Sequence, residues 1–528
     1  MIPTTMIPEF RNIIKCEEPD AIDWDGDSTD DELPMIVCEN NDVENFMFNR
    51  DEVCEVDEDA GIYWRDPDFP PYKALGCRKE GVEWKRPHEI CDNPKMFVDG
   101  GDQLDICQGS LGDCWFLAAA ATMSMHPDLL KRVCPDQTFD PNNGYTGKFS
   151  FKFYQYGKWV TVTIDDRLPT MHNQLIYVHS ATKNEFWAAL LEKAYAKLNG
   201  NYENLEGGHS TEAMVDLTGG SVEYIEKIDE MEDDDLYKLV KTAICEQGAL
   251  LTAAIQAKSR AEMEAKRSDG LICGHAYSIT KVARFRMSDD KEGSKIYQLI
   301  RLRNPWGACE WNGPFSDSDP RWGAAGADGD FSKENDENGE FWMPFADFAR
   351  IFTKIELCRL KITDIAVDGR WYQDESMRKH GQWSNDTNTA GGCANFETFT
   401  QNPFMKVQVA GGKNADEILI SLQQKHRRKQ KSAGVPFLNM GFTVYKVDEE
   451  KLSDTLADMV DRRTRPVTSS VYTARRDLTK KIKLPGDGIY LIVATTFHPD
   501  KIGKFYMQTY VERPNYNHDE FENQFYSA

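Results

Sequence analysis

The chain lacks the features that mark secreted and membrane-spanning proteins. Residues 1–12 have neither a basic start nor an apolar core, so we expect no signal peptide. No apolar run reaches the roughly 18 residues that a membrane-spanning helix needs. The 13 cysteines are odd in number and have no paired spacing, which favours a reducing compartment over a disulfide framework. There is no CxxC pair for structural zinc. These absences together indicate a cytoplasmic protein.

Positive charge is scarce. The chain has 62 Lys and Arg against 87 Asp and Glu, a net charge of −25, which argues against nucleic acid as the main partner. Residues 1–60 hold 19 of the acidic side chains and only 3 basic ones. Because such a segment repels itself and cannot bury a core, we expect it to be disordered. It would serve as a solubilising tail, a docking segment or an autoinhibitory one.

The most informative motif joins Gln108 to Cys114 through a glycine-rich turn. Residues 115–123 are helix formers and end before Pro127, which places Cys114 in the first turn of a buried helix. The positive end of that helix would favour thiolate over thiol. Gln108 has the right spacing to donate its side-chain amide to an oxyanion. A lone cysteine is more often structural, so the interpretation depends on further motifs.

Two later motifs supply the partners that a cysteine nucleophile needs. His275 lies in the strand-like run 271–282, and Asn304 ends the strand-like run 296–302, with Trp306 two residues further on. Cysteine, histidine and asparagine in this order are the parts of a papain-type triad. The imidazole would take the thiol proton, and the carboxamide would fix its tautomer. Trp306 would shield the hydrogen bond between His275 and Asn304 from water.

These motifs resemble those of the calpain family of calcium-dependent cysteine proteases. The resemblance runs from about residue 60 to about residue 513. It includes the segments Trp84–Pro87, Asp165–Thr170, Glu185–Lys197 and Gly339–Met343. It implies an α+β fold, with a two-lobed papain-like protease core followed by an antiparallel C2-like β-sandwich. Trp115 is either a core aromatic residue or a wedge between the lobes of the inactive enzyme, and the resemblance favours the wedge.

Hydrophobic patterns agree with this architecture. Alternating apolar residues at 149–153 and 160–164 predict a hairpin, and residues 186–198 predict a helix. Short strands at 404–409, 417–422, 441–445 and 488–493 predict a sandwich. Gly219 and Gly220 form a plausible hinge. The predicted parts are an acidic segment at 1–60, a lobe with Cys114 at 61–218, a lobe with His275 and Asn304 at 219–364, a β-sandwich at 365–513 and a tail at 514–528.

The resemblance also implies two calcium sites in the core, where oxygen ligands suit this hard cation. The first would use the carbonyls of Val98 and Gly100 and the carboxylates of Asp105 and Glu185. The second would use Glu310, Asp317, the carbonyl of Asp336, Asn338 and Glu340.

Three departures from the family pattern bear on regulation. Asn338 stands where an aspartate is usual, which should weaken the second site. Gln103 stands where an arginine usually links the lobes, and glutamine cannot form that ion pair. The acidic loop of the sandwich is reduced to Asp416 and Glu417, which leaves residues 425–431 strongly basic. That run is either a solvated face or a contact for anionic phospholipid.

No EF-hand loop follows the predicted sandwich in this sequence, so the resemblance is to an atypical calpain, and we expect no EF-hand small subunit as a partner. The leading hypothesis is a calcium-dependent endopeptidase that makes limited cuts in protein substrates. A calpain-like scaffold without activity is the alternative, but it would not need Cys114, His275, Asn304 and Gln108 together. A transglutaminase would need an aspartate in place of Asn304.

Overall fold

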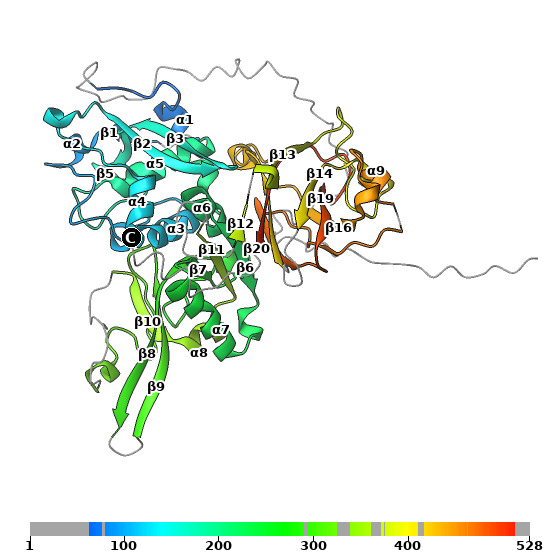
Figure 1. Cartoon of the computed structure of the whole chain (residues 1–528). Coiled ribbons are helices and arrows are strands. Elements are labelled where there is room, and N and C mark those ends of the chain that lie inside the picture. Colours follow the sequence, from blue (N-terminus) through cyan, green and yellow to red (C-terminus); the bar gives the residue numbers. More distant parts are fainter. Residues whose placement is uncertain are drawn as a thin grey trace, which may run out of the picture. The chain divides into compact units, whose positions relative to one another are not determined.

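The computed structural model describes residues 63–76, 80–289, 293–324, 338–360, 371–373, 375–409, 417–461 and 463–512. The predictions for the acidic segment 1–60, the tail 514–528, Asp336 and Asp416 lie outside these ranges. The described residues form two compact units (Figure 1). One unit falls within Ala21–Val367 and includes Arg428–Gly434. The other falls within Asp368–Arg427 and Val435–Ala528.

The first lobe of the larger unit is built around a helix whose residues are all buried. This helix is α3, Cys114–Ser124, and its alanine-rich sequence lets neighbouring elements approach closely. The other elements of the lobe are α1 (Pro71–Leu75), β1 (Glu83–Lys85), α2 (Pro87–Ile90), α4 (Pro127–Val133), β2 (Lys148–Gln155), β3 (Lys158–Asp165), β4 (Leu168–Met171), β5 (Gln174–Leu175), α5 (Trp187–Asn199) and α6 (Ser210–Thr218), with 3-10 turns at Gln103–Asp105, Pro141–Asn143 and Glu203–Leu205. The predicted hairpin is confirmed, because β2 pairs antiparallel with β3. The predicted helix at 186–198 corresponds to α5.

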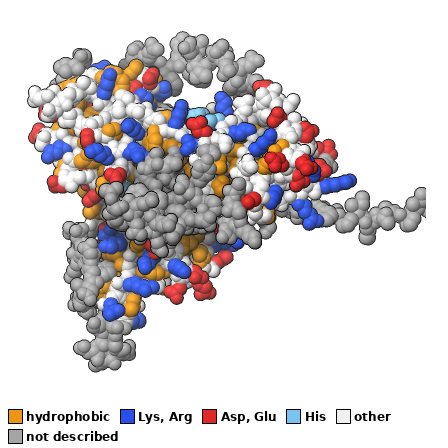
Figure 2. Space-filling view, viewed as in Figure 1, with side chains coloured by type: hydrophobic (Ala, Val, Ile, Leu, Met, Phe, Trp, Pro, Cys, Tyr) orange, Lys and Arg blue, Asp and Glu red, His pale blue; other side chains and the backbone are white. Residues whose placement is uncertain are grey.

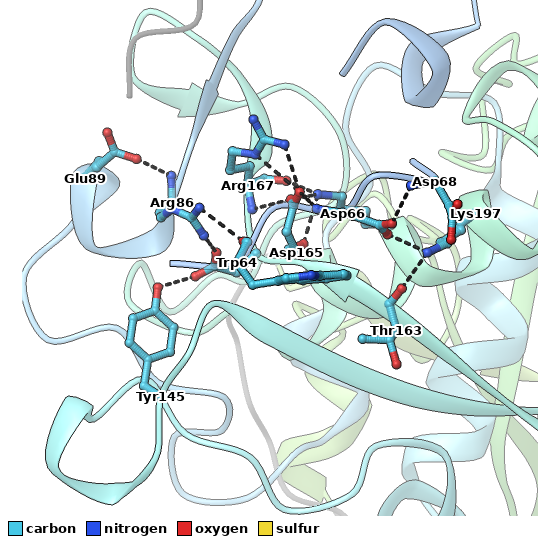
Figure 3. A network of polar contacts seen from close by, with 12 residues as sticks. Trp64, Asp66, Asp68, Arg86, Glu89, Tyr145, Thr163, Asp165, Arg167 and Lys197 are labelled. Carbon is cyan, nitrogen blue, oxygen red and sulfur yellow. Dashed lines mark hydrogen bonds and ion pairs between the residues drawn. The ribbon is translucent and has the colours of Figure 1, made fainter. Parts of the chain in front are cut away.

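A network of buried charges ties α5 to the end of β3 (Figure 3). Asp165 accepts hydrogen bonds from Lys193 Nζ at 2.6 Å and from Arg167 Nη2 at 2.9 Å. Its carboxylate also accepts from the backbone N–H of Asp66 at 2.8 Å, and Lys197 Nζ reaches Asp66 at 2.5 Å. Buried ions are tolerated only when they are paired in this way. The network therefore fixes α5, which lies next to α3 in the core.

The second lobe is a six-stranded antiparallel sheet with helices against it. The strand order is β10-β9-β8-β7-β11-β6. Its elements are β6 (Ser221–Glu226), α7 (Asp233–Lys241), a π-helical turn (Thr242–Glu246), β7 (Leu250–Ala254), β8 (Ala276–Asp289), β9 (Gly293–Arg303), β10 (Glu340–Pro344), α8 (Phe345–Ile351) and β11 (Lys354–Arg359), with 3-10 turns at Ile228–Glu230, Arg260–Glu262 and Pro320–Ala324. Figure 1 shows β8 and β9 as a long hairpin. The site residues His275 and Asn304 stand at the other end of this hairpin, one before β8 and one after β9.

The smaller unit is an antiparallel β-sandwich. One sheet has the order β12-β20-β15-β18, with β13 also paired to β20, and the other has the order β14-β19-β16-β17. Side chains such as Ile418 of one sheet and Val444 and Ile492 of the other share a core. The strands are β12 (Trp371–Tyr372), β13 (Arg378–Trp383), β14 (Phe404–Val409), β15 (Glu417–Gln424), β16 (Met440–Val447), β17 (Thr468–Ser469), β18 (Asp477–Lys483), β19 (Gly488–Thr496) and β20 (Gly503–Glu512), with helix α9 (Leu456–Met459) and 3-10 turns at Glu375–Met377, Glu397–Gln401, Arg427–Gln430 and Glu449–Lys451.

Charged side chains cover much of the visible surface. On the face shown in Figure 2, Lys and Arg side chains lie among Asp and Glu side chains over the described residues. Within the part of the chain that the structure describes, no helix has both the length and the apolar character needed to cross a membrane.

Candidate active site

Cys114 is the first residue of α3, as the sequence predicts. Its side chain is 9% exposed and packs with Ala118 of α3 and Ala276 of β8. The two lobes are hydrogen-bonded here, because Ser278 Oγ of β8 donates to the carbonyl of Ala118 at 3.0 Å. Small residues on both sides leave the thiol at the junction of the lobes, next to the start of β8.

His275 directly precedes β8 and is bound to Asn304. Its Nε2 lies 2.7 Å from Asn304 Oδ1. The backbone determines the orientation of the Asn304 amide, since Oδ1 accepts from the N–H of Trp306 at 3.0 Å and Nδ2 donates to the carbonyl of Cys309 at 3.2 Å. Oδ1 therefore faces His275, and the imidazole must carry its proton on Nε2. Nδ1 is then the proton acceptor, and this buried atom has no hydrogen-bond partner among the described residues.

Trp306 covers this histidine as the sequence predicts. The ring centroids of Trp306 and His275 are 4.8 Å apart, and the planes are tilted by 52°. His275 is 1% exposed and Asn304 is fully buried. A dry environment strengthens the hydrogen bond between them.

Burial sets the protonation of the thiol and the imidazole. It raises the pKa of Cys114 to about 12, against a weaker lowering by the backbone N–H of Ala276. It lowers the pKa of His275 to about 4, although the bond to Asn304 acts in the opposite direction. Burial therefore opposes the thiolate that the positive end of α3 is expected to favour, and it also opposes the protonated imidazole.

Gln108 lies beside Cys114 with its amide already engaged. Its Nε2 donates to the carbonyl of Leu111 at 2.6 Å, while its Oε1 is buried without a hydrogen-bond partner in the described part of the chain. The backbone N–H of Gln108 donates to the carbonyl of Pro305 at 2.8 Å, which ties this turn to the second lobe. The backbone of Gln108 is thus held at the junction of the lobes, and the predicted donation of its side-chain amide to an oxyanion stays a prediction.

Trp115 is not a wedge between the lobes in this structure. It is 2% exposed, its Nε1 donates to the carbonyl of Leu205 at 2.8 Å, and its ring packs edge-on against Phe116 and Tyr195. In this arrangement Trp115 is a core aromatic residue, which is one of the two expected roles, and the wedge in an inactive enzyme stays a prediction.

Comparison with known proteins agrees with this geometry. Residues 64–359 match the model of the calpain family cysteine protease, and residues 379–510 match that of calpain large subunit, domain III. The chain belongs to the calpain family. It is 39% identical over 480 residues to the calpain-2 catalytic subunit of Mus musculus and 40% identical over 484 residues to calpain-8 of Homo sapiens. Each alignment covers 86% of this chain but only 66% of the relative.

Three of the four residues predicted for the first calcium site in this calpain, Val98, Asp105 and Glu185, are in contact. Burial raises the pKa of Glu185 to about 7, and the pKa of Asp105, which contacts it, is also raised by burial. Two acids in direct contact need a proton or a cation between them. Val98 is adjacent, since its N–H donates to Glu185 Oε1 at 2.6 Å, and Gly100 has φ +97°, a conformation that glycine adopts readily. These residues fit a calcium ion.

The second predicted site is present in part. Burial raises the pKa of Glu310 to about 7, and it also raises the pKa of Asp317, which contacts Glu310. Asn338 follows closely, but its Oδ1 accepts from the N–H of Glu340 at 2.9 Å. The Glu340 carboxylate is bound by Arg301 at 3.0 Å, so it is less available as a ligand. Among the described residues no three His, Cys, Asp or Glu side chains gather around one point. At each of the two predicted sites, carbonyl and amide oxygens would therefore have to complete the set of calcium ligands.

Gln103 links the two lobes despite replacing the usual arginine. Its Nε2 donates to Glu340 Oε1 at 3.2 Å, and Thr280 Oγ1 donates to the same oxygen at 3.1 Å. Arg303 adds a second link, because its Nη2 donates to the carbonyl of Ile106 at 2.7 Å. The partner of position 103 is thus Glu340, which accepts a hydrogen bond from a neutral amide in place of an ion pair.

Sequence reasoning missed the role of Arg428. The basic run 425–431 was expected to be a solvated face or a lipid contact, but the Arg428 side chain is buried. Its guanidinium forms two hydrogen bonds with Glu212, at 2.7 and 2.8 Å, and lies 4.3 Å from the centre of the Trp115 ring. It also donates to the carbonyls of Asn204 and Gly207 at 3.1 Å. The pairing was not recognisable, because Glu212 lies more than 200 residues away.

Proposed function

We propose that this chain is a calcium-dependent cysteine endopeptidase that makes limited cuts in intracellular protein substrates. The observation that carries the proposal is the bond between His275 and Asn304, which leaves Nδ1 as a proton acceptor near the start of α3. A scaffold without activity would not need this tautomer. Family membership supports a peptidase, and the nine cysteines among the described residues are all free, which fits a reducing, cytoplasmic compartment.

In the proposed mechanism, the Cys114 thiol gives its proton to His275 Nδ1 as Sγ attacks the carbonyl carbon of the scissile peptide bond. The oxyanion accepts hydrogen bonds from the backbone N–H of Cys114 and from the Gln108 amide, which must turn away from Leu111. His275 then gives its proton to the leaving amine. In the second half, His275 takes a proton from water, which attacks the thioester carbonyl and releases Cys114. Asn304 holds the ring throughout.

Calcium would be held by Val98, Gly100, Asp105 and Glu185 in the first lobe and by Glu310, Asp317, Asp336, Asn338 and Glu340 in the second. When bound, it supplies positive charge that neutralises the acidic pairs and stabilises their loops. We propose that the calcium-free enzyme populates an arrangement with misaligned lobes, and that Trp115 then enters the cleft. What supports this proposal is that Glu185 contacts Asp105 and Glu310 contacts Asp317, so a cation would stabilise each pair of acids in the arrangement that it binds best.

The β-sandwich is proposed to contact anionic phospholipid, at a different place from the basic run 425–431. A hollow in this unit is lined by Ser376, Arg378, Lys379, Phe404, Met405, Lys406 and Asp454. Burial and the charge of Lys406 lower the pKa of Lys379, so the cations are close enough to repel each other. An anionic headgroup would relieve this repulsion. Reversal of both charges, Lys379→Glu with Lys406→Glu, should abolish sedimentation with phosphatidylserine vesicles. Unchanged sedimentation would contradict the assignment.

Casein digestion tests the enzymatic proposal. The chain should cleave casein into large fragments in calcium and not in chelator, and Cys114→Ala should be inactive in both. Cleavage of equal rate in strong chelator would contradict the calcium dependence but not the peptidase assignment. No cleavage under any condition, with a correctly folded chain, would favour the scaffold.

A further inference from the structure

Two buried acids lie at the start of α3, and the proposed mechanism uses neither of them. Asp113, the residue before Cys114, is 0% exposed, and Glu192 of α5 is 1% exposed. Their carboxyl groups lie close enough to interact directly. Two carboxylates cannot bond to each other, because each is only an acceptor. Two buried carboxyls this close are stable together only when at least one of them carries a proton.

The surroundings of the pair stabilise an ionised Asp113 only weakly. Both oxygens of Glu192 lie 3.3 Å from the N–H of Val178, whereas besides Glu192 the Asp113 carboxyl is approached, among the described residues, by the N–H of its own residue. An ionised Asp113 would therefore depend mainly on a proton shared with Glu192. Loss of that proton would leave two charges in an apolar core.

The titratable groups around the pair add no compensating positive charge that acts strongly on it. The Glu206 carboxylate acts on Asp113 and raises its pKa further, after burial. Tyr202 faces both acids, and its own pKa is raised by burial and by the charge of Glu192, with smaller contributions from Tyr177, Asp113 and Asp165. Burial raises the pKa of Asp113 to about 7 and that of Glu192 well above its ordinary value.

The pair is connected to the nucleophile by the backbone. The Asp113 carbonyl accepts from the N–H of Phe116 at 2.9 Å and from that of Leu117 at 3.1 Å, so it begins the hydrogen bonding of α3. The charge of Asp113 also raises the pKa of Cys114. A change in the protonation of the pair must therefore be felt by the first turn of the helix and by the thiol.

We propose that Asp113 and Glu192 are positioning residues that hold one shared proton, anchor the first turn of α3 to α5 and limit the negative charge beside Cys114. This inference rests on the proposed role of Cys114. At high pH the proton is lost, the two carboxylates repel each other, and the turn that carries the thiol moves away from α5.

The test uses the full-length chain in calcium and follows alkylation of Cys114 by iodoacetamide as a function of pH, read by peptide mass spectrometry. Glu192→Gln keeps a hydrogen-bond donor to Asp113 but cannot ionise. Asp113→Asn removes the charge nearest to the thiol, and Glu192→Ala removes the bond. Asp136→Asn is the matched control, because this acid of the same lobe has an 85% exposed side chain.

At neutral pH we expect Glu192→Gln to be alkylated at the same rate as the unchanged chain. At alkaline pH the alkylation rate of Glu192→Gln should continue to rise with pH, whereas that of the unchanged chain should reach a plateau. Asp113→Asn should lower the alkylation midpoint by about one pH unit, which is about tenfold more thiolate at a given pH. Glu192→Ala should lose rate at every pH, and Asp136→Asn should follow the unchanged chain. Infrared difference spectra should contain the band of a protonated carboxyl that Glu192→Gln removes.

Identical pH profiles for Glu192→Gln and the unchanged chain, or equal damage from Glu192→Gln and Glu192→Ala, would overturn the inference. Absence of the protonated-carboxyl band from the spectrum of the unchanged chain would also overturn the inference, and this observation does not depend on whether a variant folds. Because alkylation is read at Cys114 itself, the result does not depend on proteolysis. Failure of the proposed function would instead appear as casein cleavage by a Cys114→Ser variant.

Discussion

Replacement of Arg428 should disturb the first lobe of the protease core, although this residue follows the first strands of the sandwich in sequence. Arg428→Met keeps the aliphatic stem but removes both hydrogen bonds to Glu212. Loss of one partner of a buried ion pair costs about 3–5 kcal/mol, and a buried contact with an indole adds about 1–2 kcal/mol. Two donations to the carbonyls of Asn204 and Gly207 are lost as well.

The effect should reach the nucleophile through the loop that Arg428 holds. The carbonyl of Leu205 in this loop accepts from Trp115 Nε1 at 2.8 Å, and the N–H of Gly207 donates to the carbonyl of Gly112 at 2.7 Å. Gly112 lies two residues before Cys114. We therefore expect faster hydrogen exchange in α3 and a lower rate of casein cleavage, together with the loss of stability.

Urea unfolding followed by tryptophan fluorescence measures the loss, and hydrogen exchange at α3 locates it. Arg428→Met should lower the unfolding free energy of the larger unit by about 4 kcal/mol or more. Lys429→Met, a change at the exposed neighbouring residue, should cost less than about 0.5 kcal/mol. The double variant of Arg428→Met with Glu212→Gln should recover part of the loss. Equal midpoints for Arg428→Met and Lys429→Met would refute the reasoning.

Three further changes probe the calcium sites and the buried charges. Asp105→Asn or Glu185→Gln should raise the calcium concentration for half-maximal casein cleavage. If that concentration is unchanged, the assignment of the first calcium site is wrong. Gln103→Arg should lower that requirement by less than about fivefold, because an exposed ion pair with Glu340 is worth about 0–1 kcal/mol; no change would argue against a lobe-to-lobe link. Burial alone would raise the pKa of Asp165, but the charge of Lys193 and the bonds from Arg167 bring it well below its ordinary value. Its stabilising effect is therefore complete above about pH 4 and is lost only as pH falls towards the lower folded pKa. Asp165→Asn should destabilise the chain at pH 7, as measured by thermal unfolding, but not in strong acid.

The parts of the site that the sequence predicted are those with a local signal. Cys114 was recognisable as the first residue of a helix from its glycine-rich turn and the apolar run after it. His275 and Asn304 could be placed at strand ends because each strand has a clear apolar pattern. The pairing of Nε2 with the Asn304 amide, and hence the tautomer, required the backbone contacts of Trp306 and Cys309.

The parts that the sequence did not predict depend on distant partners. A run of lysines and arginines at 425–431 has the pattern of a solvated face, and nothing in it distinguishes Arg428 until Glu212 is found beside it. The proposed pairing of Asp113 with Glu192 also has no signal in the sequence, because an aspartate before a helix usually serves as a cap. Burial is also hidden from any local pattern, and it raises the pKa of Cys114, which opposes the predicted thiolate.

The most direct test of the account is the calcium dependence of covalent labelling at Cys114. The full-length chain would be treated with an epoxide that reacts with activated thiols, with and without calcium, and the labelled peptides identified by mass spectrometry. The account predicts label on Cys114 in calcium only, with loss of casein cleavage in proportion to labelling and no cleavage by Cys114→Ser. Label on another cysteine, or full activity in Cys114→Ser, would contradict it.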